Sequence, residues 1–212
     1  MITKFDSCNG FTKSPITKDI LARMWNKSYK PYSHYDINNL MYLTIPHYNF
    51  RGNVVMGEMV VNRCIADVTL EIFKELYCIQ YPIERMLLVD EYEANDNLSM
   101  AANNSSAFNY RFIDSTTTLS NHSQGLAIDI NPLYNPYVKT VNGCLRIQPS
   151  EGSCYADRTL QNPYYIRHGD RCYCIFKKHG FSWGGDWINS KDYQHFEYKV
   201  DQFQSNPFSR CL

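Results

Sequence analysis

The chain has 212 residues, 44% of them hydrophobic, which is enough to bury the core of one globular domain. Its 21 basic residues balance its 21 acidic residues, so no net charge directs it toward nucleic acid or a membrane surface. No apolar run approaches the roughly 20 residues that span a bilayer, and the first residues lack the apolar segment of a signal peptide. We therefore expect a small or locally recognised substrate, and either a cytosolic protein or a leader that this sequence does not include.

The first 50 residues are expected to form an irregular N-terminal extension, because they are rich in Tyr, Asn and Pro and show weak periodicity. A strand is predicted at the end of this stretch, near LMYLTIPHYNF (residues 40–50). We expect the extension, residues 1–50, to pack on the core of a main domain formed by residues 51–212.

A helix is predicted between Glu58 and Pro82. Apolar residues recur there at three- and four-residue steps, as in an amphipathic helix that a proline ends. These residues are Val61, Ile65, Val68, Ile72, Leu76 and Ile79. After this helix, Arg85–Val89 has the apolar composition of a buried strand, and residues 90–110 form a polar stretch typical of a long loop that frames a site.

A second strand is predicted along GLAIDI (residues 125–130), where apolar and small residues alternate. Asp129 shares a face with Gly125 and Ala127, which are too small to fill the space above them. We therefore expect this face to be open for an ion and its substrate. An unpaired buried carboxylate is costly, so Asp129 needs either a cation or the competing partner, Arg111.

Near the C-terminus, Asp170 is placed to cap a helix over RCYCIFKKH (residues 171–179), which Gly180 ends. A further strand is predicted in KDYQHFEYKV (residues 191–200). Its alternating residues are Gln194, Phe196 and Tyr198 on one face and His195 and Glu197 on the other. We expect this strand to end on the same face as a metal site.

Two histidines and two aspartates together predict a hydrolytic zinc centre. Such centres usually combine three imidazole or carboxylate ligands with an open position for water. His122, Asp129 and His195 supply this set from two predicted strands. Asp192 lies three residues before His195, so it can act as general base if the chain turns just ahead of the strand. The other histidines are expected to be surface or core residues: His34, His47, His168 and His179.

The segment SNHSQGLAID (residues 120–129) matches, without a departure, the SxHxxGxAxD motif of the D-alanyl-D-alanine carboxypeptidase family of zinc peptidases. Other stretches resemble the branch of that family that contains L-alanyl-D-glutamate endopeptidases and phage endolysins. They are GEMVVN, SAFNYR, LAIDINPLYNPYV, WGGDW and DYQHFE, and the resemblance covers about residues 40–200. It implies a compact α+β domain with the zinc on a central antiparallel sheet flanked by helices.

The resemblance also implies the role of each residue. Zn²⁺ is held by three ligands, His122, Asp129 and His195. Asp192 is the general base, and Arg111 lines the substrate side, where its rigid fork suits a substrate carboxylate or the developing oxyanion. Ser120 and Trp187 are further candidates for substrate binding. The family often has Glu in place of Asp192, whereas the endolysin-like branch is similar to this sequence in using Asp, so the branch is left open.

These features predict a zinc metallopeptidase that hydrolyses an amide bond next to a D-amino acid in the stem peptides of bacterial peptidoglycan. They leave open whether it is a carboxypeptidase that removes terminal D-Ala or an endopeptidase. The alternative is a non-catalytic, zinc-bearing extracellular binding domain of related fold, like the hedgehog signalling domain. Loss of the base would favour that alternative, but Asp192 is present. We expect an extracytoplasmic monomer.

Eight cysteines are many for a chain of this length, and their even number suits disulfides in an oxidising compartment. A disulfide between Cys144 and Cys154 would close a Gly/Pro/Ser loop, and one between Cys8 and Cys211 could tie the termini together. The other interpretation is that several cysteines are buried thiols that behave as small hydrophobic residues. No CxxC spacing occurs, so the sequence does not favour a structural zinc knuckle.

Overall fold

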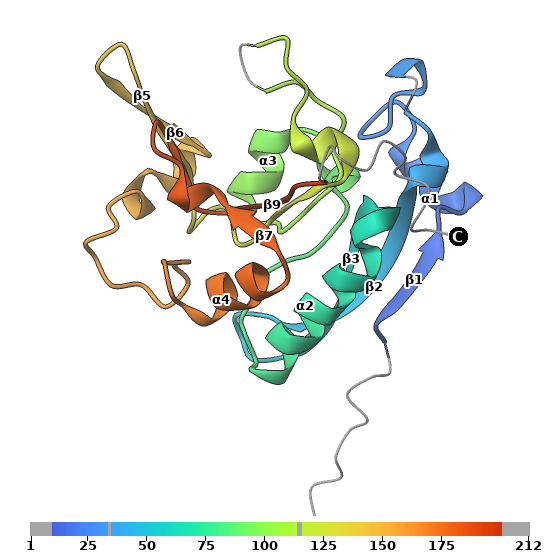
Figure 1. The fold of residues 1–212 in the computed structure, drawn as a ribbon, viewed down its shortest axis with the longest axis horizontal. Coiled ribbons are helices and arrows are strands. Elements are labelled where there is room, and N and C mark those ends of the chain that lie inside the picture. Colours follow the sequence, from blue (N-terminus) through green and yellow to red (C-terminus); the bar gives the residue numbers. More distant parts are fainter. Residues whose placement is uncertain (1–9, 34, 114–115, 201–212) are drawn as a thin grey trace, which may run out of the picture.

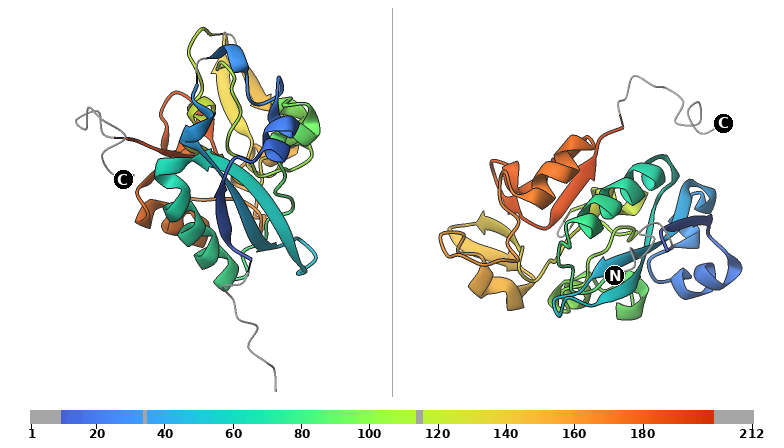
Figure 2. Two further views of the ribbon diagram at one scale, coloured as in Figure 1. Left: turned by 90° about the vertical axis from the view of Figure 1, so that its right-hand side faces the viewer. Right: turned by 90° about the horizontal axis from the view of Figure 1, so that it is seen from below.

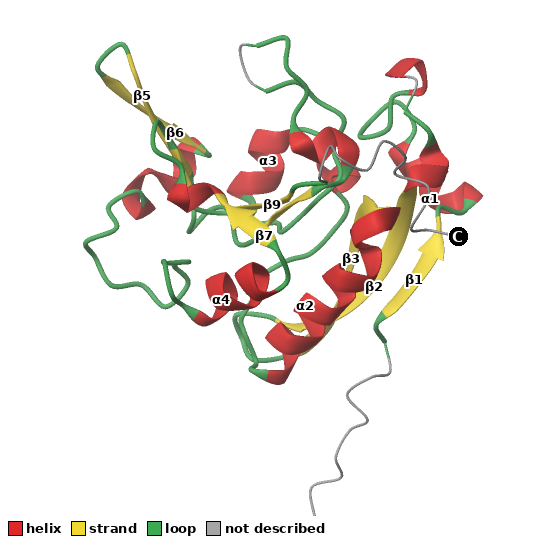
Figure 3. Cartoon of the chain, in the orientation of Figure 1, coloured by secondary structure: helices red, strands yellow, loops and turns green. Residues whose placement is uncertain are grey.

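Three antiparallel sheets of three strands each organise the described part of the chain, residues 10–33, 35–113 and 116–200 (Figure 1). The structure is a computed structural model, and its helices lie beside these sheets in one compact α+β unit (Figure 3). The predicted α+β class is confirmed, with three small sheets in place of one central sheet. None of the described helices has the length and apolar character needed to cross a membrane.

The first sheet contains a long hairpin of β2 (Leu40–Tyr48) and β3 (Val54–Asn62), with β1 (Thr12–Pro15) on the other side of β2. β2 and β3 pair residue by residue along their whole length. The strand predicted near residues 40–50 is therefore confirmed, but the helix predicted from Glu58 does not begin there. The Val- and Met-rich run that suggested the start of a helix fits both the helical and the strand period. It forms a β-strand because it pairs with β2.

The amphipathic helix begins later, as α2 (Ala66–Cys78), after the 3-10 turn η3 (Arg63–Ile65). The side chain of Asn62 accepts a hydrogen bond of 3.0 Å from the Cys64 amide and so caps the turn where β3 ends. α2 packs on β2 and also contacts α4 (Arg171–Lys178), so that it lies between the first sheet and α4 (Figures 1 and 2).

The helix predicted after Asp170 is confirmed as α4. The Asp170 carboxylate accepts a hydrogen bond of 2.7 Å from the Tyr173 amide, which satisfies one of the free donors at the start of the helix. Gly180 takes a positive φ of 87°, which turns the chain out of the helix into β7 (Phe181–Trp183).

The N-terminal region contributes more than an irregular wrap. Besides β1 and β2, it forms α1 (Lys18–Met24) and the 3-10 turns η1 (Pro31–Ser33) and η2 (Ile37–Asn39). Thr17 caps α1 by accepting a hydrogen bond from the Ile20 amide. One cluster of buried residues joins this region to the rest of the chain: Met24, Leu40, Val60, Leu88 and Phe108.

No regular strand forms at Arg85–Val89, so that prediction is wrong. The side-chain amide of Asn104 takes the place of a neighbouring strand, accepting from the Leu87 amide at 2.8 Å and donating to the Leu87 carbonyl at 3.0 Å. The stretch predicted as one long loop also contains two short helices, η4 (Val89–Tyr92) and α3 (Asp96–Ala101).

The second sheet has the order β4–β9–β7, with β9 (His195–Tyr198) between β4 (Ala127–Asp129) and β7. Both predicted strands are present, although β4 is shorter than predicted. Gly125 has a left-handed φ of 66° and ends the 3-10 turn η5 (Asn121–Gln124), so it cannot belong to the strand.

The third sheet carries a hairpin of β5 (Tyr137–Val141) and β6 (Cys144–Gln148) that projects from the body of the protein (Figure 1). The short strand β8 (Lys191–Asp192) pairs with the first residues of β5. The base of the hairpin therefore holds the backbone of Asp192, the predicted general base.

The predicted disulfide between Cys144 and Cys154 does not form, since both are exposed free thiols. Cys144 begins β6, so extended backbone carries it about 13 Å from the far end of that strand. Cys154 lies beyond that end, in the 3-10 turn η6 (Ser150–Tyr155), whereas a disulfide needs Cα atoms within about 7 Å. The other predicted pair, Cys8 and Cys211, lies outside the described residues.

The main core lies between α2, α4 and the faces of the first two sheets. Aromatic side chains fill the part of the core between α4 and the second sheet, where the rings of Phe176 and Phe196 stack with centroids 3.9 Å apart. Its fully buried members include Leu43, Ile45, Val61, Ile72, Phe73, Leu76, Ile128, Ile130, Phe176, Phe181 and Phe196. Burial of this much apolar surface fixes the second sheet against the rest of the protein.

Candidate active site

Two site residues lie directly opposite each other on neighbouring strands. Asp129 of β4 pairs with His195 of β9 in the antiparallel register, and His195 Nδ1 is 3.1 Å from Asp129 Oδ1. The apolar neighbours Ile128 and Phe196 point to the other side of the sheet and are completely buried. The core therefore fixes the two strands, and the strands fix the two polar side chains.

His122 reaches the same point from the 3-10 turn η5. This corrects the prediction that two strands supply all three ligands. The Ser120 side chain caps the turn by accepting a hydrogen bond of 3.3 Å from the His122 amide. The ring then places Nε2 at 3.2 Å from Asp129 Oδ2 and 3.2 Å from His195 Nδ1.

The open face predicted above Gly125 and Ala127 is not open at Gly125. A Cβ atom added to Gly125 would lie 2.6 Å from the Asn62 backbone nitrogen. The same contact is held by a hydrogen bond of 2.9 Å from the Asn62 amide to the Gly125 carbonyl. A glycine is needed at this position because the end of β3 packs against it. The open part of the face is therefore limited to the surroundings of Asp129.

The outward nitrogen of each histidine faces an acceptor. His122 Nδ1 lies 2.6 Å from the Ala107 carbonyl oxygen, and His195 Nε2 lies 3.6 Å from a carboxylate oxygen of Glu197. Asn121 also donates a hydrogen bond to Glu197. A proton on each outward nitrogen leaves the lone pairs of His122 Nε2 and His195 Nδ1 directed at Asp129.

The group of His122, Asp129 and His195 fits a metal ion. All three residues are buried, with 3%, 6% and 6% of their surface exposed, and their ligand atoms lie within 4.8 Å of one another. The 3.2 Å between His122 Nε2 and His195 Nδ1 is close to the edge of about 3.3–3.4 Å expected for tetrahedral ligands at 2.0–2.1 Å from zinc, and each nitrogen lies 3.1–3.2 Å from one of the two Asp129 carboxylate oxygens. Three converging lone-pair donors need a cation or added protons between them.

The charges in the group are strongly coupled. Burial raises the pKa of Asp129, but the adjacent His122 and His195 outweigh it and hold that pKa well below its ordinary value. Burial likewise lowers the pKa of His195, but Asp129 and Glu197 outweigh it and raise that pKa to about 10. In the absence of a metal, the site therefore retains a proton that a metal ion would displace.

Asp192 lies beside this group without joining it. A bend at Tyr193 and Gln194 separates β8 from β9. This bend is the turn ahead of the strand on which the predicted role of Asp192 as a base depends. Although the residue is half-buried, its Oδ1 atom is enclosed and has no hydrogen-bond partner among the described residues. Burial raises the pKa of Asp192 to about 7, and the charge on His195 offsets only part of this effect.

Gly184 is a close neighbour of this carboxylate. A Cβ atom added to Gly184 would lie 2.7 Å from the Asp192 Cβ and 3.3 Å from the His195 Cβ. The glycine in WGGDW thus permits β8 and β9 to approach the turn η7 (Gly184–Asp186).

Arg111 is not the partner of Asp129. Its Nη2 forms an ion pair of 2.9 Å with Asp96 Oδ2, and its Nε is buried without a hydrogen-bond partner among the described residues. The backbone amide of Arg111 donates to Ser123 Oγ at 2.9 Å, which ties it to η5. Its positive charge lowers the pKa of Asp192, a smaller effect than burial.

The two candidate substrate-binding residues have different surroundings. Ser120 is buried, and its hydroxyl is engaged in the cap of η5. Trp187 is half-buried, and its ring centroid lies 5.3 Å from that of His195, so it lines the site. Among the other histidines, His47 is buried in the core and His168 and His179 are bound to side chains elsewhere, whereas His34 lies outside the described residues.

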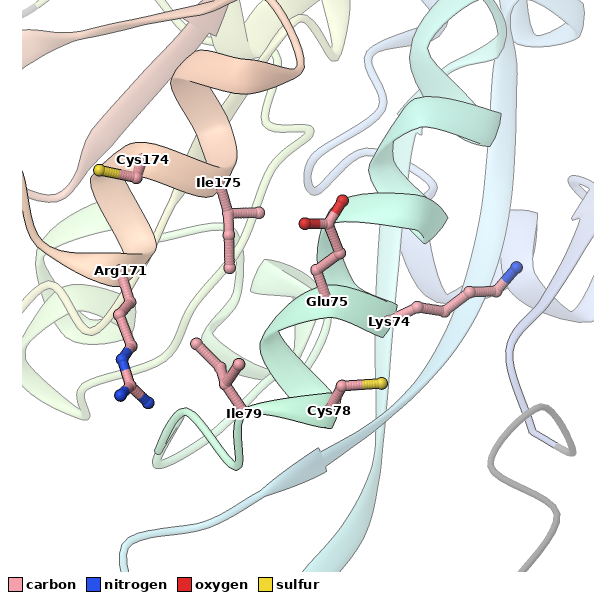
Figure 4. Close-up of a pocket in the computed structure, with 7 residues that line it drawn as sticks. All are labelled: Lys74, Glu75, Cys78, Ile79, Arg171, Cys174 and Ile175. Atoms are coloured by element: carbon pink, nitrogen blue, oxygen red, sulfur yellow. The ribbon is translucent and has the colours of Figure 1, made fainter.

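A cavity of about 530 Å³ lies away from this group, between α2 and α4 (Figure 4). Its lining residues are Lys74, Glu75, Cys78, Ile79, Arg171, Cys174 and Ile175. None of the site residues contributes to it.

A buried His–Asp–His group beside an unpaired carboxylate is typical of metal-dependent hydrolases. The family model described as D-alanyl-D-alanine carboxypeptidase matches residues 114–198, a segment that contains this whole group and Asp192. The chain is therefore similar to the D-alanyl-D-alanine carboxypeptidase family over residues 114–198, and the resemblance seen in the sequence is confirmed over that segment. The match does not distinguish between the branches of the family. Neither a curated protein nor a solved structure matches the chain.

Two groups that orient the histidines have no role in the sequence prediction, Glu197 and the carbonyl of Ala107. The strand period places Glu197 on the face of His195, two residues along, but does not indicate its contact with the ring. The Ala107 carbonyl has no sequence signal, because any residue supplies the same backbone oxygen.

Proposed function

We propose that the protein is a zinc-dependent peptidase that hydrolyses an amide bond next to a D-amino acid in peptidoglycan stem peptides. The observation that carries this proposal is the convergence of His122, Asp129 and His195 at 3.1–3.2 Å, beside the unpaired carboxylate of Asp192. The family match supports a peptidase, and the donor set supports zinc. Because peptidoglycan lies outside the cytoplasm, the proposal includes an extracytoplasmic location.

Two nitrogen atoms and one carboxylate oxygen would hold the ion. When bound, zinc lowers the pKa of water toward about 7 and polarises a carbonyl group. The protein contributes orientation: Ala107 and Glu197 hold the rings of His122 and His195 so that their ligand atoms converge. The strand pairing of Asp129 with His195 keeps their backbones in register.

Asp192 would move the proton. Its carboxylate takes a proton from the attacking water and delivers it to the leaving nitrogen of the cut amide bond. Its raised pKa, about 7, makes it a better proton acceptor and donor near neutral pH than an ordinary aspartate. The enclosed, unpaired Oδ1 atom gives it no competing partner among the described residues.

Arg111 and Trp187 would bind the substrate on either side of the reacting bond. The guanidinium of Arg111 uses Nη2 for Asp96, and its other donors can bind a carboxylate or the oxyanion. The ring of Trp187 provides a flat apolar surface beside His195. A terminal carboxylate bound at Arg111 would make the enzyme a carboxypeptidase, and an internal carbonyl there would make it an endopeptidase.

The deciding experiment is mass spectrometry of the products after zinc-loaded protein is incubated with defined muropeptides. Loss of a terminal D-Ala identifies a carboxypeptidase, and two stem fragments identify an endopeptidase. If no stem peptide of any length is cut by protein shown to hold one zinc per chain, the proposal is wrong and the non-catalytic binding domain is the better description.

A further inference from the structure

Arg158 is an arginine that the site chemistry does not use, yet it lies between two segments that carry site residues. It belongs to the connection between η6 and α4 and is half-buried. The structure shows no ion pair between Arg158 and a carboxylate in the described residues. Burial lowers the pKa of Arg158 to about 10, so the surroundings do not compensate its charge fully.

Neutral acceptors satisfy the guanidinium on one side. Nη1 donates to the Tyr134 carbonyl at 3.0 Å, and Nη2 donates to Asn135 Oδ1 at 3.2 Å and to the Ile166 carbonyl at 2.7 Å. Tyr134 and Asn135 lie on the segment that leaves β4 after Asp129. Asn135 is completely buried and also accepts a hydrogen bond of 2.7 Å from the Ile166 amide. This side of Arg158 is thus anchored in a rigid network.

Two tyrosine rings pack against the guanidinium. The Arg158 Cζ atom lies 3.8 Å from the ring centroid of Tyr165 and 4.3 Å from that of Tyr193. Both distances are within the range of a cation–π interaction, which favours the flat, weakly hydrated arginine head. Tyr165 belongs to the same connection as Arg158, whereas Tyr193 belongs to the bend between β8 and β9.

That bend carries the proposed base and a proposed ligand on either side of Tyr193. Asp192 is the residue before it, and His195 is two residues after it. The backbone of the bend has two anchors, because Trp183 Nε1 donates to the Tyr193 carbonyl at 3.0 Å and the Ile130 amide donates to the Gln194 carbonyl at 3.0 Å. The Tyr193 amide, in contrast, is 3.5 Å from the Pro136 carbonyl, which is a long hydrogen bond. Its ring is held by Arg158.

We propose that Arg158 is a positioning residue, which holds the Tyr193 bend through its ring and so places Asp192 over the His–Asp–His group. The proposal rests on the proposed function, since the placed group is the proposed general base. A displacement of about 1 Å in a catalytic group can lower the rate by up to about 10²-fold, so a contact that fixes the bend has a large effect on turnover. Lysine could not replace the arginine, because it lacks the planar fork that both stacks and donates.

A matched pair of variants separates positioning from stability. Tyr193→Leu removes the ring that links Arg158 to the bend and leaves the neutral hydrogen-bond acceptors of Arg158 in place. Tyr165→Leu removes the other ring that packs on Arg158 and leaves the link to the bend. Tyr193→Phe keeps the ring. We expect Tyr193→Leu and Arg158→Met to lower kcat about tenfold or more with KM within about threefold, while Tyr165→Leu and Tyr193→Phe keep kcat near the wild-type value.

Three further measurements complete the test. The double variant Arg158→Met/Tyr193→Leu should lose no more kcat than the worse single variant, because both changes break the same contact. Thermal unfolding gives the stability of each variant, and turnover is compared at a temperature where all are folded. The Co²⁺ absorption spectrum shows whether the ligand group still binds a metal, which we expect in every variant. If Arg158→Met does not fold, the two Tyr193 variants and Tyr165→Leu decide the question.

The two proposals fail in different ways. A wild-type protein that cuts no stem peptide contradicts the proposed function. A wild-type protein that is active, with a Tyr193→Leu variant that has unchanged kcat, contradicts the positioning role. Equal losses of kcat in Tyr193→Leu and Tyr165→Leu also overturn it, because they show a general effect on packing.

Discussion

Asp129 and His195 are direct cross-strand partners, and their side chains meet with His195 Nδ1 at 3.1 Å from Asp129 Oδ1. The backbone hydrogen bonds of the sheet therefore set the distance between two proposed metal ligands. His122 depends instead on a 3-10 turn that Ser120 caps and Gly125 ends. Strand pairing and a capped turn thus position the site, and removal of one ligand should weaken metal binding without unfolding the protein.

His195→Ala should lose most of the bound zinc, because two donor atoms remain where three are needed. Elemental analysis after dialysis should show about one zinc per chain for the wild type and well below one for the variant. His168→Ala, at an exposed histidine, is the matched control and should keep its zinc. Wild-type protein that has no metal after careful zinc loading, or that is equally active in a strong chelator, would contradict the zinc proposal.

Glu197→Gln tests a residue that has no role in the sequence prediction. The carboxylate faces His195 Nε2 at 3.6 Å and receives a hydrogen bond from Asn121. Loss of its charge should weaken zinc binding by about 10–100-fold, the usual effect of removing a partner that orients a ligating histidine. Competition with a zinc chelator measures the affinity. An unchanged affinity would show that Glu197 does not orient the ring.

His47, which is not one of the site residues, should make the free energy of unfolding depend on pH. It is buried, its Nε2 has no hydrogen-bond partner among the described residues, and burial lowers its pKa below the ordinary value of about 6.5. The unfolded chain therefore binds the proton first. As the pH falls through about 6.5 toward the lower folded pKa, the free energy of unfolding should decrease.

Urea unfolding at several pH values tests this dependence. His47→Gln removes the titrating group, so its free energy of unfolding should vary less between neutral and mildly acidic pH than that of the wild type. His168→Gln, at an exposed histidine, is the control and should retain the wild-type dependence. Parallel curves for wild type and His47→Gln would mean that other groups cause the pH effect.

The motif residues were the part of the site that the sequence predicted best. His122, Asp129, His195 and Asp192 were singled out because their types and spacing suit a hydrolytic metal centre, and the fold brings all four together. These residues are predictable because side chains alternate between the two faces of a strand, which is a local property of the sequence. Asp129 and His195 can each be assigned to a polar face in this way. Their pairing is a long-range property that only the structure shows.

The errors have physical causes that a single sequence does not reveal. Gly125 was interpreted as open space, but its missing side chain makes room for the Asn62 backbone, which is 63 residues earlier in the chain. The run before residue 62 fits helical and strand periods equally, and pairing with β2 decides in favour of a strand. The expected strand at Arg85–Val89 is replaced by side-chain hydrogen bonds from Asn104, which no periodicity predicts.

Asp192 is the residue that separates an enzyme from a binding protein. If it is a general base, Asp192→Asn should keep the zinc and the fold, because the amide has nearly the same shape and Asp192 is not one of the three converging ligands. It should lower kcat by about 10²–10⁴-fold, the usual contribution of positioned proton transfer. The matched control is Asp186→Asn, at an exposed carboxylate on the neighbouring turn η7, which should have wild-type turnover.

Zinc content and peptide turnover must be measured on the same Asp192→Asn preparation. Full zinc with strongly reduced turnover supports the base, since the ligand group is intact while proton transfer is lost. Full zinc with undiminished turnover rules out Asp192 as the base. Loss of zinc makes Asp192 a fourth ligand, and the two rings and two carboxylates would then form a closed structural site rather than one with an open position for water.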